Sequence, residues 1–279
     1  MNKVVILATT DVHGCVYAHS YADASIQDYG LTRFSTAVKQ YRDQGEVYVL
    51  DNGDILQGTP FLTTANQDDD GKHVLSRIMN AIGYDFINLG NHDFNYGYPV
   101  LKRYLDDTQA TCLTSNISYQ DHALGSSRLI TTASGKIIAL IGVCTDYIPH
   151  WEKPENIRDM TFLDPFATVK AEIQRLTPLA DRIVVMYHGG VERDPDSGKL
   201  TQRDTGENIG YRLAQLEGID ILITGHQHRS FTCVINSTQV VQTTYNALEF
   251  AEITIDFDND PKARLKIVKM KDFPIDSQI

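Results

Sequence analysis

Five apolar segments of this chain are each followed at once by a short motif that contains Asp, Asn or His. The motifs are Asp11-Val12-His13, Gly53-Asp54, Gly90-Asn91-His92-Asp93, His188-Gly189-Gly190 and Gly225-His226-Gln227-His228. Several of the preceding segments are apolar at successive positions, as in strands whose two faces are both covered. In open α/β sheets, ligands bind beyond the carboxyl ends of the strands. The pattern therefore predicts an α/β fold that collects reactive side chains at the carboxyl end of one sheet.

The hydrophobic pattern between these motifs predicts alternating strands and helices. Apolar residues recur at helical spacing from Leu31 to Tyr41 and from Val74 to Ile82, and Asp164-Pro165 predicts the N-cap and first turn of another helix. Beyond Gly225 the expected strands follow one another without helices, which predicts a second, more antiparallel sheet. We therefore expect two stacked sheets flanked by helices. The expected strands are residues 4–9, 47–50, 86–89, 137–143, 183–187, 219–224, 240–241, 251–257 and 265–270.

Length and composition are typical of an ordinary globular protein. The 279 residues are 42% hydrophobic and 22% charged, which suits one large α/β domain or two small ones. No apolar stretch approaches the roughly 18–20 residues that cross a bilayer, and the start of the chain lacks the features of a signal peptide. We expect no membrane association. As written, the chain is expected to be cytoplasmic, or secreted or cell-wall bound if a signal peptide has been removed.

The formal net charge of −11 argues against sequence-independent binding to nucleic acid, which needs a basic surface. It does not exclude small phosphorylated substrates, because bound cations can reverse the local sign. The cysteines are far apart and form no CxxC pair, so we expect free thiols instead of disulfides or a zinc–cysteine site. They are Cys15, Cys112, Cys144 and Cys233.

Several polar features outside the motifs are expected to be structural or solvent-facing. Asp68-Asp69-Asp70 beside Gly71 predicts a solvated loop, and the Lys and Arg residues between 262 and 271 predict the exposed face of an edge strand. The histidines without a preceding strand are expected to be structural or exposed. They are His19, His73, His122 and His150.

The motifs supply enough ligands for two metal ions. The candidates are Asp11, His13, Asp54, Asn91, His188, His226 and His228. Side chains two apart on an extended segment point the same way, so Asp11 with His13, and His226 with His228, are expected to act as pairs. Mixed carboxylate, imidazole and amide donors favour Mn, Fe, Co or Zn. These donors are too many for one tetrahedral zinc, and the central Asp54 is the candidate bridge between two cations.

A pair of cations about 3.5–4 Å apart can lower the pKa of a bridging water and stabilise both the attacking and the leaving oxygen of a phosphate ester. The glycines before the ligands fit this hypothesis, since they allow sharp turns and close backbone approach. A single HxH or DxH pair is weak evidence, because such residues are usually surface groups. The succession of all the motifs, each after a strand, predicts phosphate-ester hydrolysis with a hydroxide between the metals as the attacking group.

The motifs resemble those of the calcineurin-like metallophosphoesterases. Thr9-Thr10-Asp11-Val12-His13-Gly14, Asp51-Asn52-Gly53-Asp54 and Asn91-His92-Asp93-Phe94-Asn95-Tyr96-Gly97 look like the 5′-nucleotidase family. Within that family they are most similar to the 2′,3′-cyclic-nucleotide 2′-phosphodiesterases/3′-nucleotidases. The resemblance extends from about Val4 to Phe257. It implies a four-layer α/β/β/α sandwich of two mixed sheets.

The resemblance also implies a role for each candidate. One metal would be held by Asp11, His13, Asp54 and His228, and the second by Asp54, Asn91, His188 and His226. His92 would contact the phosphate and help to protonate or stabilise the leaving oxygen. The implied substrate is a small nucleotide, either a cyclic phosphodiester or a 3′- or 5′-monophosphate.

The chain departs from the family pattern in two respects. Many 5′-nucleotidases pair this histidine with Asp three residues later, where this chain has Asn95, and an amide cannot hold an imidazolium as a carboxylate does. The cyclic phosphodiesterase branch commonly carries Asn here, so Asn95 remains a candidate catalytic residue. Relatives also carry a C-terminal domain that stacks on the nucleobase. We expect residues 1–279 to be a single catalytic domain without it, and base selectivity to be poor.

Two other functions remain open. A nuclease of the same fold would need a Lys- and Arg-rich surface for the polynucleotide backbone, which the net charge disfavours. A non-catalytic metal-binding scaffold would be expected to have lost ligands or His92, and none is lost.

Overall fold

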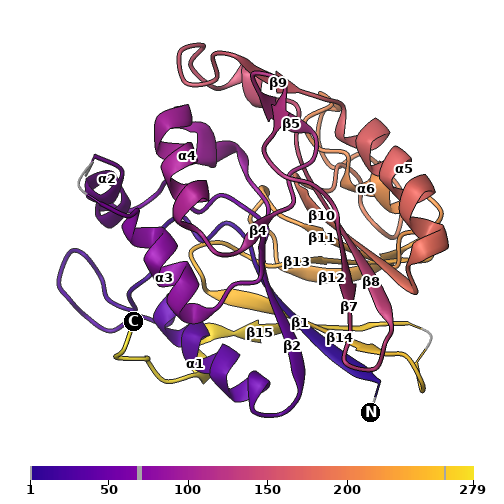
Figure 1. The fold of residues 1–279 in the computed structure, drawn as a ribbon, viewed down its shortest axis with the longest axis horizontal. Coiled ribbons are helices and arrows are strands. Elements are labelled where there is room, and N and C mark those ends of the chain that lie inside the picture. Colours follow the sequence, from indigo (N-terminus) through magenta and orange to yellow (C-terminus); the bar gives the residue numbers. More distant parts are fainter. Residues whose placement is uncertain (1, 68–70, 261) are drawn as a thin grey trace.

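The side chains of strand β1 (Lys3–Thr9) alternate between two hydrophobic layers, and this alternation explains the stacking of the sheets. Val4, Ile6 and Ala8 lie in a cluster that contains side chains of both sheets, whereas Leu7 packs in the cluster beneath the helices. The structure is a computed structural model that describes residues 2–67, 71–260 and 262–279. Figure 1 shows the two sheets stacked in the middle, with helices on both outer faces.

The first sheet is mixed, with parallel strands at its centre. β1 pairs in parallel with β2, and β2, β3 and β4 continue in parallel, whereas β14 lies antiparallel to β1 on the other side. Its strands, from edge to edge, are β15 (Arg264–Lys269), β14 (Glu249–Asp256), β1, β2 (Glu46–Asp51), β3 (Phe86–Ile87) and β4 (Thr111–Cys112).

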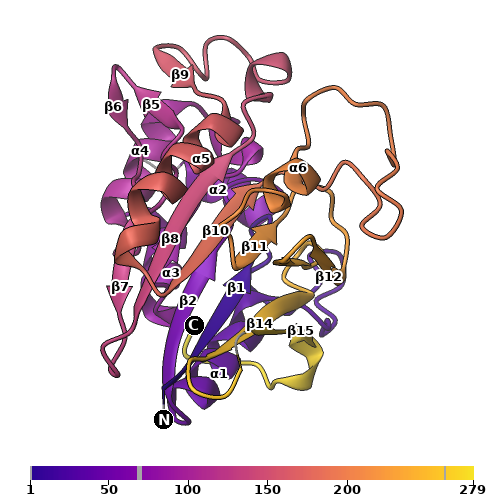
Figure 2. The same ribbon diagram turned by 90° about the vertical axis from the view of Figure 1, so that its right-hand side faces the viewer.

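The second sheet is also parallel at its centre and antiparallel at both edges. Its strands, from edge to edge, are β12 (Phe231–Ile235), β13 (Thr238–Gln242), β11 (Ile221–Thr224), β10 (Arg182–His188), β8 (Ile137–Cys144) and β7 (Arg128–Thr131). A small antiparallel sheet lies at the top of Figure 2 and contains β6 (His122–Ala123), β5 (Ile117–Tyr119) and β9 (Met160–Phe162).

The helices divide into two groups, one on each outer face, and Figure 2 shows α5 lying against β8 and β10. Phe34, Leu75 and Tyr104 belong to the cluster between the first sheet and its helices, and Val169 and Leu213 belong to the cluster on the second sheet. The helices are α1 (Leu31–Arg42), α2 (Pro60–Gln67), α3 (Val74–Ile82), α4 (Tyr98–Asp107), α5 (Pro165–Leu176) and α6 (Gly210–Ala214), with single 3₁₀ turns η1 (Asn91–Phe94), η2 (Ile148–His150), η3 (Thr177–Leu179) and η4 (Met270–Asp272).

This architecture confirms the predicted four-layer α/β/β/α sandwich. Asp164 caps α5, since its side chain accepts a hydrogen bond from the N–H of Phe166 at 2.8 Å. Strand β15 is an edge strand whose Arg264, Lys266 and Lys269 are exposed, as expected. The four cysteines are free. Among the helices described, none has the length and apolar character needed to cross a bilayer.

Two expectations about the sheets are wrong. The strands after Gly225 do not form a sheet of their own: β12 and β13 extend the second sheet, and β14 and β15 return to the first sheet beside β1. The polar motifs therefore do not lie at the end of one sheet, because β1, β2 and β3 belong to the first sheet and β10 and β11 to the second. Expected strand bounds also differ, since β3 ends at Ile87 and β11 begins at Ile221. The predicted loop Asp68-Asp69-Asp70 lies outside the described residues.

Candidate metal centre

Most candidate metal ligands lie in turns where the backbone is left-handed. Positive φ angles of 50–68° occur at Asp11, His13, Asp54, His226 and His228. Such angles are strained for residues other than glycine and cluster at functional sites. Hydrogen bonds between the turns hold them, with the N–H of Asp11 donating to Gly53 and that of His13 to Asp54, both at 2.9 Å. The expectation of extended pairs is therefore wrong, because β1 ends at Thr9 and β11 at Thr224, before the paired ligands, and the backbone turns at these ligands.

Glycine is required where two of these turns touch. A Cβ atom on Gly90 would lie 2.3 Å from Oδ1 of Asp54 and 2.7 Å from Cε1 of His188, and one on Gly225 would lie 2.4 Å from Oγ1 of Thr10. The predicted role of Gly90 and Gly225 in close backbone approach is confirmed by these distances.

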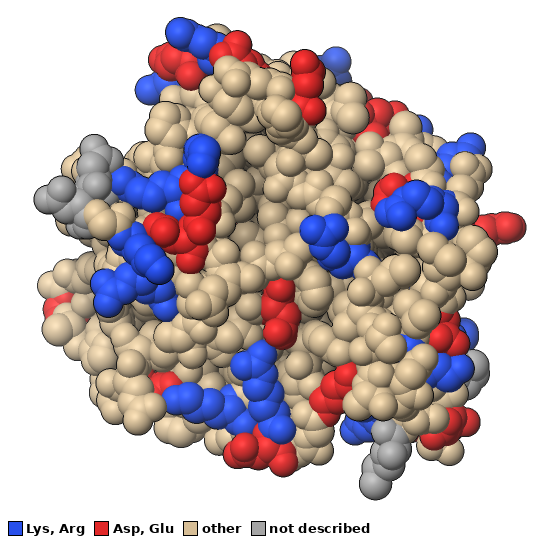
Figure 3. Space-filling model, in the orientation of Figure 1, with Lys and Arg blue, Asp and Glu red and all other residues tan. Residues whose placement is uncertain are grey.

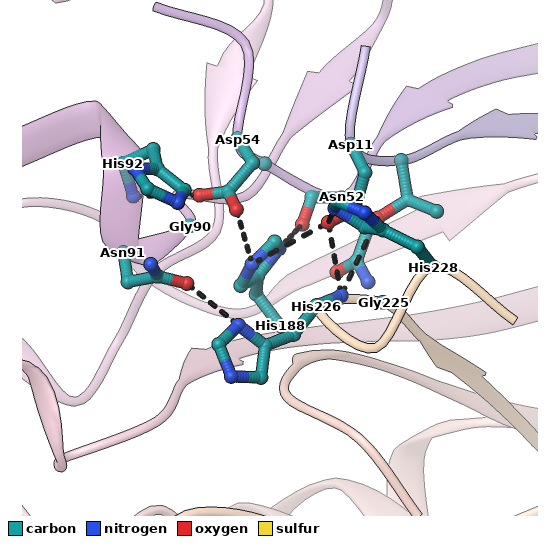
Figure 4. Close-up of polar contacts among 12 residues, drawn as sticks. Asp11, Asn52, Asp54, Gly90, Asn91, His92, His188, Gly225, His226 and His228 are labelled. Atoms are coloured by element: carbon teal, nitrogen blue, oxygen red, sulfur yellow. Dashed lines mark hydrogen bonds and ion pairs between the residues drawn. The ribbon is translucent and has the colours of Figure 1, made fainter. Parts of the chain in front are cut away.

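The candidate ligands gather into two neighbouring groups. Figure 4 labels all of these ligands except His13. The first contains Asp11, His13 and His228: Nε2 of His228 lies 3.4 Å from Oδ1 of Asp11 and 3.1 Å from Nε2 of His13. Two imidazole nitrogens facing one carboxylate oxygen at such distances form a suitable cradle for a cation. His226 and His228 thus do not act as a pair, since only His228 lies in this group.

The second group contains Asp54, His188 and His226. Nε2 of His188 lies 3.2 Å from Oδ2 of Asp54 and 4.0 Å from Oδ1 of Asp11, so this buried imidazole lies between the carboxylates of both groups. Asn91 joins the group, because its Oδ1 lies 2.8 Å from Nδ1 of His226. All the predicted metal ligands are therefore brought together in space, with Asp54 and His188 at the middle.

Hydrogen bonds outside the groups orient the histidines. Nδ1 of His13 donates to the carbonyl of Gln57 at 3.0 Å, and Nδ1 of His188 to the carbonyl of Asn52 at 2.7 Å. In each ring the other nitrogen, Nε2, then faces the site. A carboxylate or carbonyl behind a ligating imidazole fixes its tautomer and its orientation in this way.

The carboxylates at the centre are electrostatically coupled to His188. Burial alone would lower the pKa of His188, but the Asp54 and Asp11 carboxylates outweigh burial and raise it to about 10. Burial alone would raise the pKa of Asp11, but His228 and His188 lower it below its ordinary value. The pKa of Asp54 is lowered in the same way, chiefly by His188. The centre therefore favours ionised carboxylates facing a positive charge.

One buried atom tests whether the site suits a metal. Nε2 of His188 is fully buried and lies 3.2 Å from Asp54 and 4.0 Å from Asp11, but neither contact has the geometry of a hydrogen bond. Buried polar atoms are rarely left without a partner unless a ligand, ion or water satisfies them. A divalent cation bound there would satisfy this nitrogen and both carboxylates at once. The donor set and its orphaned nitrogen therefore fit a metal ion.

His92 lies beside both groups, on the turn η1. Its backbone N–H donates to Oδ1 of Asp54 at 2.7 Å, and its ring centroid lies 5.4 Å from that of His13. Its Nδ1 lies 2.7 Å from Oδ1 of Asn95. The two predicted catalytic residues are thus in contact with each other and adjacent to the candidate ligands.

Sequence analysis missed Asp93 although it lies within a motif. This buried carboxylate accepts four backbone N–H groups: Oδ1 from Ile55 and Leu56, both at 2.9 Å, and Oδ2 from Asp54 at 3.0 Å and Gly90 at 2.7 Å. It thereby ties the turn that carries Asp54 to the turn that carries Asn91 and His92. Burial and the nearby Asp54 raise the pKa of Asp93, and the N–H donors act in the opposite direction.

Three other contacts were missed because nothing in the sequence marks their residues. Oε1 of Glu207, on the loop that precedes α6 and projects in Figure 2, lies 2.8 Å from Nε2 of His226. The half-exposed rings of Trp151 and Tyr245 stack on His226 and His228, with centroids 5.4 Å and 4.6 Å apart. These aromatic side chains form part of the wall around the two groups.

A family model for calcineurin-like phosphoesterases matches residues 4–230, most of the chain. The chain belongs to this family. Members are hydrolytic and normally bind two divalent metal ions, in agreement with the two candidate ligand groups. The calcineurin-like fold predicted from the sequence is therefore confirmed.

The relatives of this calcineurin-like phosphoesterase include nucleotidases. It is 29% identical over 247 residues to the trifunctional nucleotide phosphoesterase YfkN of Bacillus subtilis, with 81% of the chain and 16% of that protein covered. It is 27% identical over 265 residues to a 2′,3′-cyclic-nucleotide 2′-phosphodiesterase/3′-nucleotidase of Yersinia enterocolitica, with 87% and 40% covered. The chain thus spans less than half the length of these curated relatives.

A solved structure supports the same placement. The crystal structure of a Staphylococcus aureus protein assigned as a 5′-nucleotidase, in complex with α-ketoglutarate, superposes with a TM-score of 0.90 at 32% identity. The match covers 99% of this phosphoesterase and 56% of that chain. The predicted resemblance to the 5′-nucleotidase family is confirmed by these similarities.

Proposed function

We propose that this phosphoesterase hydrolyses nucleotide phosphate esters, either 2′,3′-cyclic phosphodiesters or 3′- and 5′-monophosphates, at the centre described above. The observation that carries the proposal is the convergence of two ligand groups on the buried Asp54–His188 contact. The names of the Bacillus and Yersinia relatives support nucleotides as the substrate class. The described residues are proposed to form one catalytic domain, because one hydrophobic cluster joins both sheets.

Each group is proposed to hold one divalent cation (Mn, Zn, Fe or Co). Asp11, His13 and His228 would hold one, and His188, His226 and Asn91 the other, with Asp54 between them. When bound, such a pair supplies an activated water and neutralises the charge of the phosphate. The strained turns and buried hydrogen bonds of the chain hold the ligands in place before substrate arrives.

His92 is proposed to act on the leaving oxygen. Its backbone N–H binds the Asp54 carboxylate, and Asn95 orients its ring through Nδ1, which leaves Nε2 available for the substrate. As the P–O bond breaks, negative charge develops on the leaving oxygen, and a hydrogen-bond donor there stabilises the transition state. The small nucleotide is expected to approach along the aromatic wall of Trp151 and Tyr245.

No observation favours the nuclease alternative. Figure 3 shows positive and negative side chains interspersed over one face of the molecule, without a broad basic patch on that face. A polynucleotide substrate needs such a patch to neutralise its phosphates.

Hydrolysis assays with Mn²⁺ test the proposal. The substrates are bis-p-nitrophenyl phosphate, p-nitrophenyl phosphate, 2′,3′-cyclic AMP, 3′-AMP and 5′-AMP. We expect turnover of at least one nucleotide, its loss after chelation, and a fall of roughly 10²–10⁴-fold in His92→Ala with unchanged metal content. Absence of turnover from protein shown to hold two metal ions would reject the proposal and favour a scaffold.

A further inference from the structure

In this chain the partner of His92 at Nδ1 is an amide, that of Asn95, but a carboxylate lies one side chain further away. Nδ2 of Asn95 lies 2.5 Å from Oε2 of Glu152, and Oδ1 of the same amide lies 2.7 Å from Nδ1 of His92. The three side chains form a continuous chain of hydrogen bonds that begins at a glutamate and ends in the candidate site. Glu152 is separated from Asn95 by 57 residues, and no motif marks it.

Several hydrogen bonds hold the Glu152 carboxylate in this position. The backbone N–H of Glu152 donates at 3.0 Å to the carbonyl of Ile148, the first residue of the turn η2. Its Oε1 accepts from the N–H of Lys153 and from Nδ2 of Asn156, both at 2.8 Å. Nδ2 of Asn156 also donates to the backbone carbonyl of Asn95 at 2.8 Å, so it contacts both partners. Glu152 is therefore fixed by its own segment and by the segment that carries Asn95.

The donor and acceptor atoms determine the direction of the hydrogen bonds that join His92, Asn95 and Glu152. An ionised carboxylate only accepts hydrogen bonds, so the atom of Asn95 that faces Glu152 must be the NH₂ group. The carbonyl oxygen of Asn95 then faces His92, and Nδ1 of His92 must carry a hydrogen. With the amide oxygen at Nδ1, the ring can hold hydrogens on both nitrogens, so that Nε2–H is a donor while Nδ1–H stays bound. An NH₂ group facing Nδ1 would permit only the singly protonated ring, in which Nδ1 accepts and Nε2 carries the hydrogen.

We propose that Glu152 is a positioning residue for His92: it fixes the orientation of the Asn95 amide and thereby holds the imidazole with Nδ1–H bound and Nε2 turned toward the leaving oxygen. The inference rests on the proposed function. The role of Glu152 explains how an asparagine at position 95 can still hold the imidazole of His92 in a fixed orientation. Trp151, the residue before Glu152, stacks on His226, so the segment after β8 contacts both Asn95, the hydrogen-bond partner of His92, and a candidate metal ligand.

The dependence of rate on the leaving group separates positioning from a general structural role. The leaving oxygen of a nucleoside develops more localised charge than that of p-nitrophenol, whose ring delocalises the charge. A misplaced His92 should therefore slow 3′-AMP or 2′,3′-cyclic AMP much more than p-nitrophenyl phosphate.

The experiment compares Glu152→Ala with Glu155→Ala, an exposed glutamate on the same segment. Wild-type turnover of both kinds of substrate is measured first, so failure of the proposed function is recognised before any variant is compared. For Glu152→Ala we expect kcat on the nucleotide to fall by about 10–100-fold with little change in KM, against a few-fold at most for p-nitrophenyl phosphate. Glu155→Ala should match the wild type.

Two further variants protect the test against misfolding. Glu152→Gln keeps the size of the side chain and is expected to show the same substrate dependence with a smaller amplitude. Asn95→Asp places a carboxylate directly against His92 but also against Glu152, so we expect the single variant to be impaired by like-charge repulsion. The double variant Asn95→Asp/Glu152→Ala removes that repulsion and should recover nucleotide turnover above either single variant.

Each other outcome overturns the proposal. An equal loss on both kinds of substrate, or a loss accompanied by reduced metal content or a lower Tm, would make Glu152 a structural residue only. Unchanged nucleotide turnover in Glu152→Ala would remove any role. Failure of the double variant to exceed the single variants would contradict the proposed route through Asn95.

Discussion

Replacement of Asp93 by Asn should destabilise the protein strongly although the two side chains have nearly the same shape. The Asp93 carboxylate accepts two backbone N–H groups on each oxygen, which join the turn of Asp54 to the turn at Gly90. An Asn side chain keeps one acceptor oxygen and turns the other into an NH₂ group. Two buried N–H donors then face a donor and lose their partner.

The magnitude follows from that count. A buried donor without a partner costs about 1–3 kcal/mol, so two such donors cost about 2–6 kcal/mol. Part of the cost is offset because the neutral amide no longer repels the Asp54 carboxylate, the neighbour that helps to raise the pKa of Asp93. We therefore expect a loss of about 2–4 kcal/mol in the free energy of unfolding.

Guanidinium denaturation followed by circular dichroism measures this loss as a shift of the midpoint at unchanged slope. Asp121→Asn is the matched control: Asp121 is exposed with φ 65°, a conformation that Asn also adopts, so its stability should change by less than about 0.5 kcal/mol. A change of less than about 1 kcal/mol in Asp93→Asn would refute the role of this carboxylate in joining the two turns.

Three further results are expected. Metal binding near pH 8 should release a proton from His188, because the Asp54 and Asp11 carboxylates raise its pKa to about 10, and calorimetry in buffers of different ionisation enthalpy should show a proton release that disappears above that pH. The raised pKa also stabilises the metal-free fold: this stabilisation is complete below the unfolded-state pKa of 6.5 and is lost as the pH rises through about 10. Glu207→Gln should weaken metal affinity by about 10–100-fold because His226 loses its charged partner, whereas Glu217→Gln, at an exposed position, should leave the affinity unchanged. Equal affinities of the two variants in a chelator competition would show that Glu207 does not affect metal binding. Burial raises the pKa of the Cys15 thiol to about 12 and that of Cys233 to about 11, so both thiols should react slowly with a disulfide reagent at pH 8 in the native protein and quickly in the unfolded protein. A fast reaction of Cys15 in the native protein would contradict its burial.

The sequence was sufficient to predict the layers and to single out side chains that the fold brings together as candidate ligands. Buried strands leave a strong apolar pattern, as in β1, β8 and β10, and several of the strands, β1 and β10 among them, lead into a polar motif that carries its own chemistry. The pattern does not contain the strand order. It could not show that β14 returns to pair with β1, which separates the ligands of β1 and β10 into two sheets.

The geometry of the centre was beyond the sequence for a different reason. Left-handed backbone at Asp11 and His226 is imposed by tertiary contacts between turns, against the local preference of the residues. Glu207 and Glu152 lie outside any motif, and their functional contacts arise only when loops meet His226 and Asn95 in space. Asp93 was visible in its motif, but its role needs the four N–H donors that the fold brings around it.

The positions of bound metal ions test the central claim most directly. Anomalous diffraction from a crystal of the protein loaded with Mn²⁺ should give two peaks about 3.5–4 Å apart. One is expected between Asp11, His13 and His228, and the other between Asp54, His188 and His226, with the Asp54 carboxylate touching both. A single peak, or peaks away from these side chains, would contradict a two-metal centre built from the ends of two sheets.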